Sequence, residues 1–345
     1  MRVGLDVGST TIKCVVLDDR NNLIYHTYER HYSHIVEKSA ELLRRVAERC
    51  GREAVFAISG SAGMGMAESV KAPFVQEVFA TRVAANRLAP GTDVIIELGG
   101  EDAKIIFFGG ALEERMNGSC AGGTGAFIDQ MATLLKMGAE EMDKAAQTAE
   151  KTYTIAARCG VFAKSDIQPL INQGAKSADI AKSIYQAVVN QTIAGLAQGR
   201  PIKGHVLYLG GPLTFSKCLR QSFDETLGVT GTCPENSLLF VALGAAFYAE
   251  ESWDLLKTAE LLEQRGMSET YRSQPPLFEN QAEYDAFKAR HAKAAVPQAD
   301  FPTDYAKPVH IGIDSGSTTV KVAVINENAE LLFTDYRPNQ GDPIA

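Results

Sequence analysis

A strand, a turn of glycine and hydroxyl residues, and a second strand occur near both ends of this sequence. The segment 4–28 matches the segment 312–336 at about ten of roughly 25 positions, and both contain the turn Gly-Ser-Thr-Thr. A glycine turn between two apolar runs predicts a tight hairpin. The fold must therefore be one that uses this hairpin as a building unit.

The chain between the two copies alternates strand and helix patterns. Short aliphatic runs predict strands at 3–7, 12–17, 23–25, 54–59, 94–98, 103–108 and 206–209. Apolar residues at helical spacing predict helices at 34–49, 127–137, 180–196 and 238–249. The two strands that enclose Gly99 and Gly100 form a second glycine hairpin. The fold class is therefore α/β, and the two hairpins point to one shared site.

The length of 345 residues and the changes in composition predict several domains. We expect a first lobe over 1–92, a second lobe over 93–250, a linker or helical hairpins over 251–309, and the start of a second repeat over 310–345. The expected linker is rich in charge and contains five prolines. Because the last segment contains only the first hairpin, we expect a truncated domain whose parent chain continues. The alternative is a terminal strand pair that packs on the first lobe.

Charge and hydropathy exclude several classes of protein. The chain has 34 basic and 42 acidic residues, a net charge of -8, and its basic residues are scattered, so nucleic acid is not an expected partner. The most apolar stretch, 238–249, is shorter than the roughly 20 residues that span a bilayer, so no membrane association is expected. Asp6 lies where a signal peptide would have its apolar core, which predicts a cytoplasmic protein.

The first hairpin has the residues of a phosphate site. A turn formed by Gly8, Ser9, Thr10 and Thr11 exposes backbone N–H groups and hydroxyls to phosphate oxygens, and Lys13 adds a positive charge. Asp6 ends the preceding strand, where its carboxylate can hold Mg²⁺ through water. A single segment of this kind can also be a purely structural hairpin.

The second hairpin favours a phosphate site, because it repeats the order of an acidic residue and a glycine turn between two strands. Gly99 and Gly100 form its turn, and Glu97, Glu101 and Asp102 surround that turn as candidates for activating water. Neither hairpin is a Walker A loop, since GxxxxGK[ST] is absent, and the glycines at 60–65 have the wrong spacing for GxGxxG.

These residues resemble a known superfamily. The hairpin that follows Asp6, the hairpin at Gly99 and the later pair Gly210 and Gly211 are similar to the two phosphate motifs and the adenosine motif of the superfamily containing actin, the heat-shock chaperone ATPases, hexokinase and acetate kinase. Within it, the segments 117–125 and 157–166 closely resemble the activators of 2-hydroxyacyl-CoA dehydratases and the ATPase subunits of benzoyl-CoA reductase. The resemblance covers about residues 3–250, and the later repeat resembles the long, multi-domain members.

The resemblance implies a two-lobed, actin-like ATPase fold, with a ribonuclease-H-like mixed sheet flanked by helices in each lobe. It also implies ATP or ADP with Mg²⁺ in the cleft between the lobes, with Gly210 and Gly211 beside the adenosine. The chain departs from the family at Glu97, where members usually carry Asp, and at Glu101, where they usually carry Gln. These departures concern the residues that place water and metal at the second hairpin.

Two of the six cysteines have surroundings suited to an iron–sulfur cluster. Cys120 lies among glycines before a helix expected to be capped by Thr124, and Cys159 is expected to follow a strand and precede a helix that begins near Ser165. Helix N-termini favour thiolates and anions, although each cysteine taken alone can also be a buried, inert thiol. Since a [4Fe-4S] cluster needs four ligands, two per chain indicate a cluster shared by a homodimer. The resemblance implies the same arrangement.

The parts together predict an ATP-hydrolysing reductive activase. A ferredoxin or flavodoxin would reduce the shared cluster, and ATP would drive the electron to a partner iron–sulfur protein, either dehydratase-like or of the double-cubane type. Two alternatives stay open. A small-molecule kinase of the same fold needs the ATP site but leaves the cysteine motifs unexplained, and a non-catalytic ATP-binding scaffold is favoured by Glu97 and the interrupted repeat.

Overall fold

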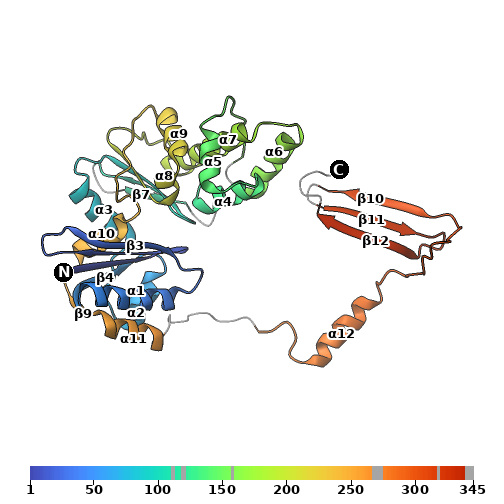
Figure 1. The fold of residues 1–345 in the computed structure, drawn as a ribbon, viewed down its shortest axis with the longest axis horizontal. Coiled ribbons are helices and arrows are strands. Elements are labelled where there is room, and N and C mark those ends of the chain that lie inside the picture. The colour runs from blue at the N-terminus through green and yellow to red at the C-terminus, as the bar shows by residue number, and fades with distance from the viewer. Residues whose placement is uncertain (110–112, 118–121, 157–158, 266–274, 317–318, 339–345) are drawn as a thin grey trace. The chain divides into compact units, whose positions relative to one another are not determined.

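The structure is a computed structural model that describes residues 1–109, 113–117, 122–156, 159–265, 275–316 and 319–338 (Figure 1). The chain divides into two compact units, Met1–Glu269 and Thr270–Ala345. The first unit contains two mixed sheets flanked by helices, so the predicted α/β class is confirmed.

The first sheet has the strand order β3-β2-β1-β4-β9. Its strands are β1 (Arg2–Val7), β2 (Thr11–Leu17), β3 (Leu23–Arg30), β4 (Glu53–Ser59) and β9 (Ser252–Asp254). β1 is antiparallel to β2 and parallel to β4. Apolar residues of β1, β2 and β4 form one core with α1 (Ile35–Cys50), α2 (Gly63–Val70) and α11 (Leu255–Arg265). β1, β2 and β4 are buried on both faces, which explains why they are nearly continuous apolar runs in the sequence, whereas β3 alternates between half-buried and exposed residues.

The second sheet repeats the topology of the first, with the order β7-β6-β5-β8. Its strands are β5 (Val94–Leu98), β6 (Ala103–Phe107), β7 (Glu113–Met116) and β8 (Val206–Leu209), with β5 antiparallel to β6 and parallel to β8. The helices of this lobe are α4 (Gly125–Leu134), α5 (Ala139–Ala146), α6 (Gly160–Asn172), α7 (Ser177–Thr192) with a π-helical turn at Ile193–Ala197, α8 (Gly211–Phe215) and α9 (Lys217–Leu227). Most of them share one core with the strands.

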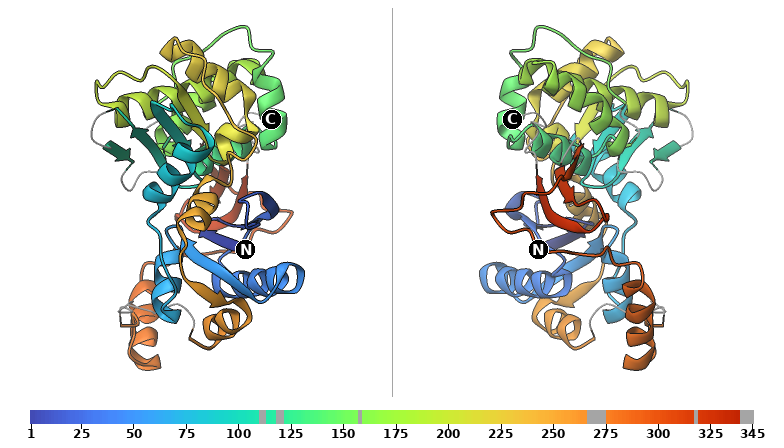
Figure 2. Two further views of the ribbon diagram at one scale, coloured as in Figure 1. Left: turned by 90° about the vertical axis from the view of Figure 1, so that its left-hand side faces the viewer. Right: turned by 90° about the vertical axis from the view of Figure 1, so that its right-hand side faces the viewer.

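Two helices, α3 (Glu77–Leu88) and α10 (Phe240–Tyr248), lie side by side between the two sheets (Figure 2). Their apolar residues share a cluster with Val15 and Leu17 of the first sheet and Ile95 and Ile106 of the second. Small residues allow the close approach, because a Cβ at Gly244 of α10 would overlap the backbone of Ala80 in α3. The two lobes are therefore joined through one tightly packed helix pair.

The structure corrects the expected linker and the expected end of the second lobe. Residues 252–254 form β9, which pairs antiparallel with β4, and α11 packs against α1, so 252–265 complete the first lobe. α10, expected in the second lobe, packs on the first sheet, where a Cβ at Gly4 of β1 would overlap the carbonyl of Ala242. These placements depend on contacts with distant parts of the chain. A strand of three residues, such as β9, is too short to be predicted from its own sequence.

The second unit contains the repeated hairpin. It comprises α12 (Gln281–Ala292) and a sheet of β10 (His310–Ser315), β11 (Thr319–Ile325) and β12 (Leu331–Pro338) in that order. Asp314 pairs with Lys321 in the strand register and forms a 2.9 Å ion pair, as Asp6 does with Lys13. The repeat in the sequence is thus also a repeat in the structure. In the described ranges, no helix is both long enough and apolar enough to cross a membrane.

The close contact between α10 and α3 predicts that replacing Gly244 by alanine lowers the stability of the protein, whereas this change usually raises it in a helix. In an unhindered helix interior, Gly→Ala is stabilising by about 1 kcal/mol, but at Gly244 the added methyl would collide with the backbone of Ala80. We expect Gly244→Ala to lower the free energy of unfolding by about 2 kcal/mol, measured by urea denaturation. Gly109→Ala, where a Cβ meets nothing within 4 Å, is the control and should stay within about 0.5 kcal/mol of the parent chain. A stabilised Gly244→Ala variant would contradict the packing.

Candidate functional site

The β1–β2 turn, the β5–β6 turn and the segment after β8 line a single cavity of about 960 Å³. The structure brings together in this lining every acidic, phosphate-binding and adenosine-binding residue that the sequence suggested. They are Asp6, Gly8, Ser9, Thr10, Thr11, Lys13, Glu97, Gly99, Gly100, Glu101, Asp102, Gly210 and Gly211. Residues separated by some 200 positions in the sequence therefore share one site.

The first hairpin presents a buried charge pair beneath its turn. Asp6 is 2% exposed, and its Oδ2 lies 2.9 Å from Nζ of Lys13, its partner in the β1–β2 register. Burial lowers the pKa of Lys13, but the attraction of Asp6 outweighs burial and leaves that pKa raised. Lys13 is therefore a permanent cation at the cavity wall. The turn is closed by the Gly8 N–H, which donates to the Thr11 carbonyl at 2.9 Å.

The second hairpin reaches the first across the cavity. A Cβ at Gly100 would lie 2.5 Å from Oγ1 of Thr10, so a side chain there would force the Thr10 side chain to move. Gly210 has φ +85° and would place a Cβ against the carbonyl of Leu98, which makes glycine necessary at the end of β8. The two glycine turns therefore approach each other closely at the cavity.

A buried lysine gathers carboxylates from two parts of the fold. Lys104 on β6 has a side chain 3% exposed, and its Nζ lies 2.5 Å from Glu77 Oε1 and 2.6 Å from Asp102 Oδ2. Glu77 is the first residue of α3, whereas Asp102 belongs to the β5–β6 turn. Burial raises the pKa of Glu77, and Lys104 opposes that rise. The ion pairs therefore link α3 to the second hairpin at the base of the cavity.

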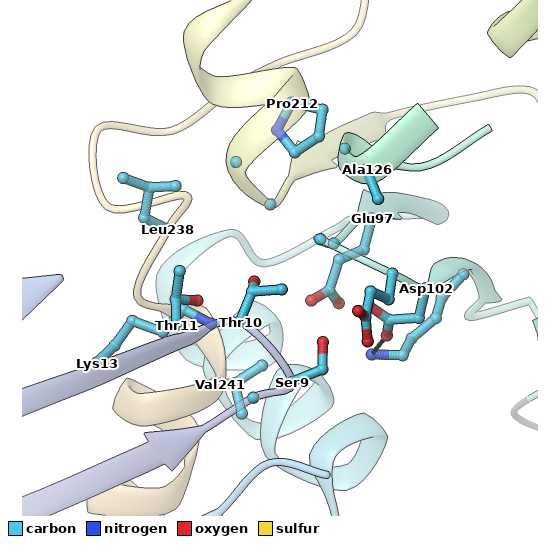
Figure 3. Close-up of a pocket in the computed structure, with 18 of the residues that line it drawn as sticks. Ser9, Thr10, Thr11, Lys13, Glu97, Asp102, Ala126, Pro212, Leu238 and Val241 are labelled. Atoms are coloured by element: carbon cyan, nitrogen blue, oxygen red, sulfur yellow. Dashed lines mark ion pairs between the residues drawn. The ribbon is translucent and has the colours of Figure 1, made fainter. Parts of the chain in front are cut away.

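Glu97 is the carboxylate that the network leaves without a bond. It lies opposite Lys104 in the β5–β6 register, but its buried Oε2 accepts no hydrogen bond from the described residues. Burial raises the pKa of Glu97 to about 7, and the attraction of Lys104 limits the rise. In Figure 3 the carboxylates of Glu97 and Asp102 and the hydroxyl of Ser9 point into the same part of the cavity. This part of the site is suited to a cation or a proton.

Sequence analysis missed Glu77 and Lys104. Lys104 is predicted from the sequence only as a residue of the strand at 103–108. A lysine among the aliphatic residues of a buried strand needs an anion nearby, and this unusual placement is the sequence signal that could have identified it. Glu77 had none, because its partner is contributed by a strand far along the chain.

Of the two cysteine positions, Cys159 is not among the residues that line this cavity. Cys120 falls in 118–121, outside the described residues. Cys159 is half-buried and is the N-cap residue of α6, which begins at Gly160 rather than near Ser165. The described residues 151–156 form no strand before it. Ser165 lies within α6, and its hydroxyl donates to the Val161 carbonyl one turn earlier in the same helix at 3.1 Å.

The start of α6 lies beside the middle of α4. Thr124 is the N-cap residue of α4, as the sequence suggested, and a Cβ at Gly160 would lie against Oε1 of Gln130 in α4. In the described residues, no group of three or more His, Cys, Asp or Glu side chains is placed to hold a metal ion. Burial raises the pKa of Cys14 to about 12 and keeps that thiol protonated.

Two sheets of one topology, joined by a helix pair and enclosing a cavity between glycine hairpins, define an actin-like ATPase. The chain belongs to the BadF/BadG/BcrA/BcrD ATPase family, whose sequence profile matches residues 3–249. The (R)-2-hydroxyglutaryl-CoA dehydratase activating ATPase of Acidaminococcus fermentans is 28% identical over 252 residues, which is 72% of this chain and 96% of that protein.

Solved structures agree on the fold. Component A of the Acidaminococcus fermentans (R)-2-hydroxyglutaryl-CoA dehydratase matches 75% of this chain and 98% of its own, with 26% identity and a TM-score of 0.66. The activator of the 2-hydroxyisocaproyl-CoA dehydratase from Clostridium difficile, solved with bound ADPNP, matches 79% of this chain and 99% of its own, with 24% identity and a TM-score of 0.63. The latter likeness concerns the fold alone.

The buried Glu97 predicts a pH-dependent effect of its removal. Between pH 4.5 and about 7 the unfolded chain loses this proton while the folded chain keeps it, so the folded state loses stability as the pH rises. Glu97→Gln cannot ionise, and we expect it to raise the free energy of unfolding at pH 8 by on the order of 3 kcal/mol. The gain should nearly vanish at pH 4.5. Urea denaturation at both pH values measures it.

Glu48→Gln, on the exposed surface of α1, is the matched control for losing one charge. It should change the free energy of unfolding by less than about 0.5 kcal/mol at either pH. Equal effects of Glu97→Gln at pH 4.5 and pH 8 would show that Glu97 is not a buried proton-binding group.

Proposed function

We propose that this protein is an ATP-dependent one-electron reductase that activates a partner iron–sulfur protein of the 2-hydroxyacyl-CoA dehydratase type. One observation carries the proposal: two phosphate-type hairpins enclose one cavity, and the second hairpin is hydrogen-bonded to the start of α4, the helix that follows Cys120. Relatives named as dehydratase activators support it.

The residues of the cavity fit a nucleotide with Mg²⁺. The turn formed by Gly8, Ser9, Thr10 and Thr11 would hold phosphates with Lys13, and Gly99 and Gly100 would hold them from the other lobe. Gly210 and Gly211 would flank the adenosine. Asp6 supplies a hard oxygen for the cation, and Mg²⁺ commonly binds one or two carboxylates together with phosphate oxygens. The unbonded Oε2 of Glu97 supports the fit, because a buried carboxylate oxygen normally has a partner.

Glu97 is the strongest candidate for taking a proton from the attacking water. Asp102 is paired with Lys104, and Glu101 is exposed, whereas Glu97 is unbonded and titrates with a pKa of about 7. A general base works best when its pKa lies near the working pH. We assign the remaining acids, Glu101 and Asp102, to orienting water and to holding Lys104.

Cys120 and Cys159 would together supply two thiolates per chain, and a second copy would supply the other two. Cys159 suits this role because it caps α6, whose free N–H groups favour a negative ligand. A [4Fe-4S] cluster held there would accept one electron from a ferredoxin or flavodoxin and donate it to the partner protein. The acceptor would be a dehydratase-like or double-cubane iron–sulfur protein.

A pair of backbone bonds joins the second hairpin to the start of α4, the helix that follows Cys120 in the sequence. The N–H groups of Gly125 and Ala126 donate to the carbonyls of Gly99 and Gly100 at 3.0 and 2.7 Å. A change in the hairpin when nucleotide is exchanged would therefore move the N-terminus of α4 directly. A nucleotide can drive such a change only through its different affinity for the two arrangements.

Removal of Asp6 tests the ATPase. We expect Asp6→Asn to lower kcat for ATP hydrolysis by on the order of 10²-fold, because a buried carboxylate that orients the cation is lost. Phosphate release in the presence of Mg²⁺ measures the rate. Asp19→Asn, in the exposed turn region after β2, should leave it unchanged. A parent chain that hydrolyses no ATP would favour a non-catalytic scaffold instead.

Anaerobic reconstitution with iron and sulfide tests the cluster. We expect about two irons per chain in a dimer, since one four-iron cluster would be shared by two subunits. The Cys120→Ala, Cys159→Ala double variant should bind none, while Cys50→Ala and Cys218→Ala serve as cysteine controls and should bind as the parent does. An iron-free monomer that still hydrolyses ATP would favour a small-molecule kinase.

A further inference from the structure

His31 lies directly behind the first phosphate turn. It follows β3, precedes α1 and is only 2% exposed. It is not among the residues that line the cavity. Sequence analysis gave this histidine no role, and the proposed catalytic and binding residues do not include it. Because buried polar side chains are normally hydrogen-bonded, the partners of this imidazole indicate what it does.

Two hydrogen bonds join His31 to the turn, one on each side of Ser9. Its backbone N–H donates to the Thr10 carbonyl at 3.3 Å, and its ring Nε2 lies 3.0 Å from the Gly8 carbonyl. Two carbonyls of the turn, those of Gly8 and Thr10, are therefore bonded to one residue. The Gly8 N–H to Thr11 carbonyl bond closes the same turn from within.

The protonation state of the ring follows from its partners. The Ser33 N–H donates to Nδ1 at 3.1 Å, so Nδ1 must carry a lone pair. A neutral ring then carries its hydrogen on Nε2 and can donate it to the Gly8 carbonyl. The local backbone is shaped around these bonds, because Tyr32 and Ser33 are both left-handed, with φ of 48° and 66°. Two consecutive non-glycine residues adopt that region only when the surroundings hold them there.

These bonds fix the direction of the N–H groups that phosphate would meet. In a planar trans peptide the carbonyl and the following N–H point in opposite directions. Because the Gly8 carbonyl is directed at His31, the Ser9 N–H is directed away from His31. The same holds for the Thr10 carbonyl and the Thr11 N–H. The turn lines the cavity and His31 does not, so the bond to the Gly8 carbonyl leaves the Ser9 N–H on the side of the turn away from His31.

We propose that His31 is a positioning residue for the nucleotide phosphates: its Nε2–H holds the Gly8 carbonyl so that the Gly8–Thr11 turn is preorganised to receive phosphate oxygens. The inference rests on the proposed function, since it requires that this turn binds ATP. The imidazole does not touch the phosphate; it acts through the peptide group between Gly8 and Ser9. Its contribution therefore belongs to nucleotide affinity rather than to the chemical step.

Two substitutions separate the two ring bonds. Gln can place an amide N–H near the position of Nε2 and keep the donor to Gly8, whereas Asn can place an amide oxygen near Nδ1 and keep only the acceptor for Ser33. We expect His31→Asn to raise the Kd for Mg·ATP about tenfold and His31→Gln to stay within about threefold of the parent chain. The exposed His26→Gln on β3 is the control and should bind as the parent does.

Isothermal titration with Mg·ATP gives the Kd values, and phosphate release at saturating ATP gives kcat. A rise in KM for His31→Asn, with kcat retained within about twofold and the midpoint of thermal unfolding unchanged, supports the inference. Equal weakening by Asn and Gln would overturn it, because the ring would then be needed only for structure. No weakening by Asn would overturn it as well. A parent chain that binds no Mg·ATP would instead overturn the proposed function, and the inference with it.

Discussion

The contact between two glycine turns is the constraint on which this structure depends. Gly100 approaches Thr10 so closely that a single added methyl group would force the Thr10 side chain to move. Each turn ends a β-hairpin of the same topology, so the contact sets how the edges of two sheets face one another. The cavity exists because the hairpins meet at their turns while the sheets behind them are held apart by α3 and α10.

Buried charge gives this meeting point its chemistry. Asp6 with Lys13, and Glu77 and Asp102 with Lys104, form ion pairs in the wall of the cavity. Buried ion pairs add little to the free energy of folding compared with apolar packing, so stability alone does not explain why these pairs gather at one place. The pairs leave Glu97 without a bond in the same wall, and the surplus negative charge is what a cation or a proton would neutralise. The charges are thus arranged for a ligand rather than for the fold.

The sequence allowed the fold class and the cavity lining to be predicted because both depend on local signals. Asp6 and Lys13 are seven residues apart in one hairpin, and a hairpin turn brings them together without help from the rest of the chain. Glu77 and Lys104 meet only after the two lobes have packed, so no local pattern connects them. The same reason explains β9, whose three residues are a strand only because β4 pairs with them. The start of α6 was predicted five residues too late because its N-cap residue, Cys159, is not one of the usual capping residues and its side chain forms no capping hydrogen bond.

The backbone bonds from Gly125 and Ala126 to the second hairpin join the cavity lining to the start of α4, the helix that follows Cys120 in the sequence. In most helices the first N–H groups are satisfied by a cap side chain, by water or by a ligand. In α4 they are satisfied by the carbonyls of the phosphate-type turn itself, so the helix cannot keep its position if the turn moves. The turn in turn is held against Thr10, whose carbonyl is bonded to His31. A movement of this turn would therefore reach α4 directly, and a nucleotide would couple the two places to the extent that it binds their two arrangements with different affinity.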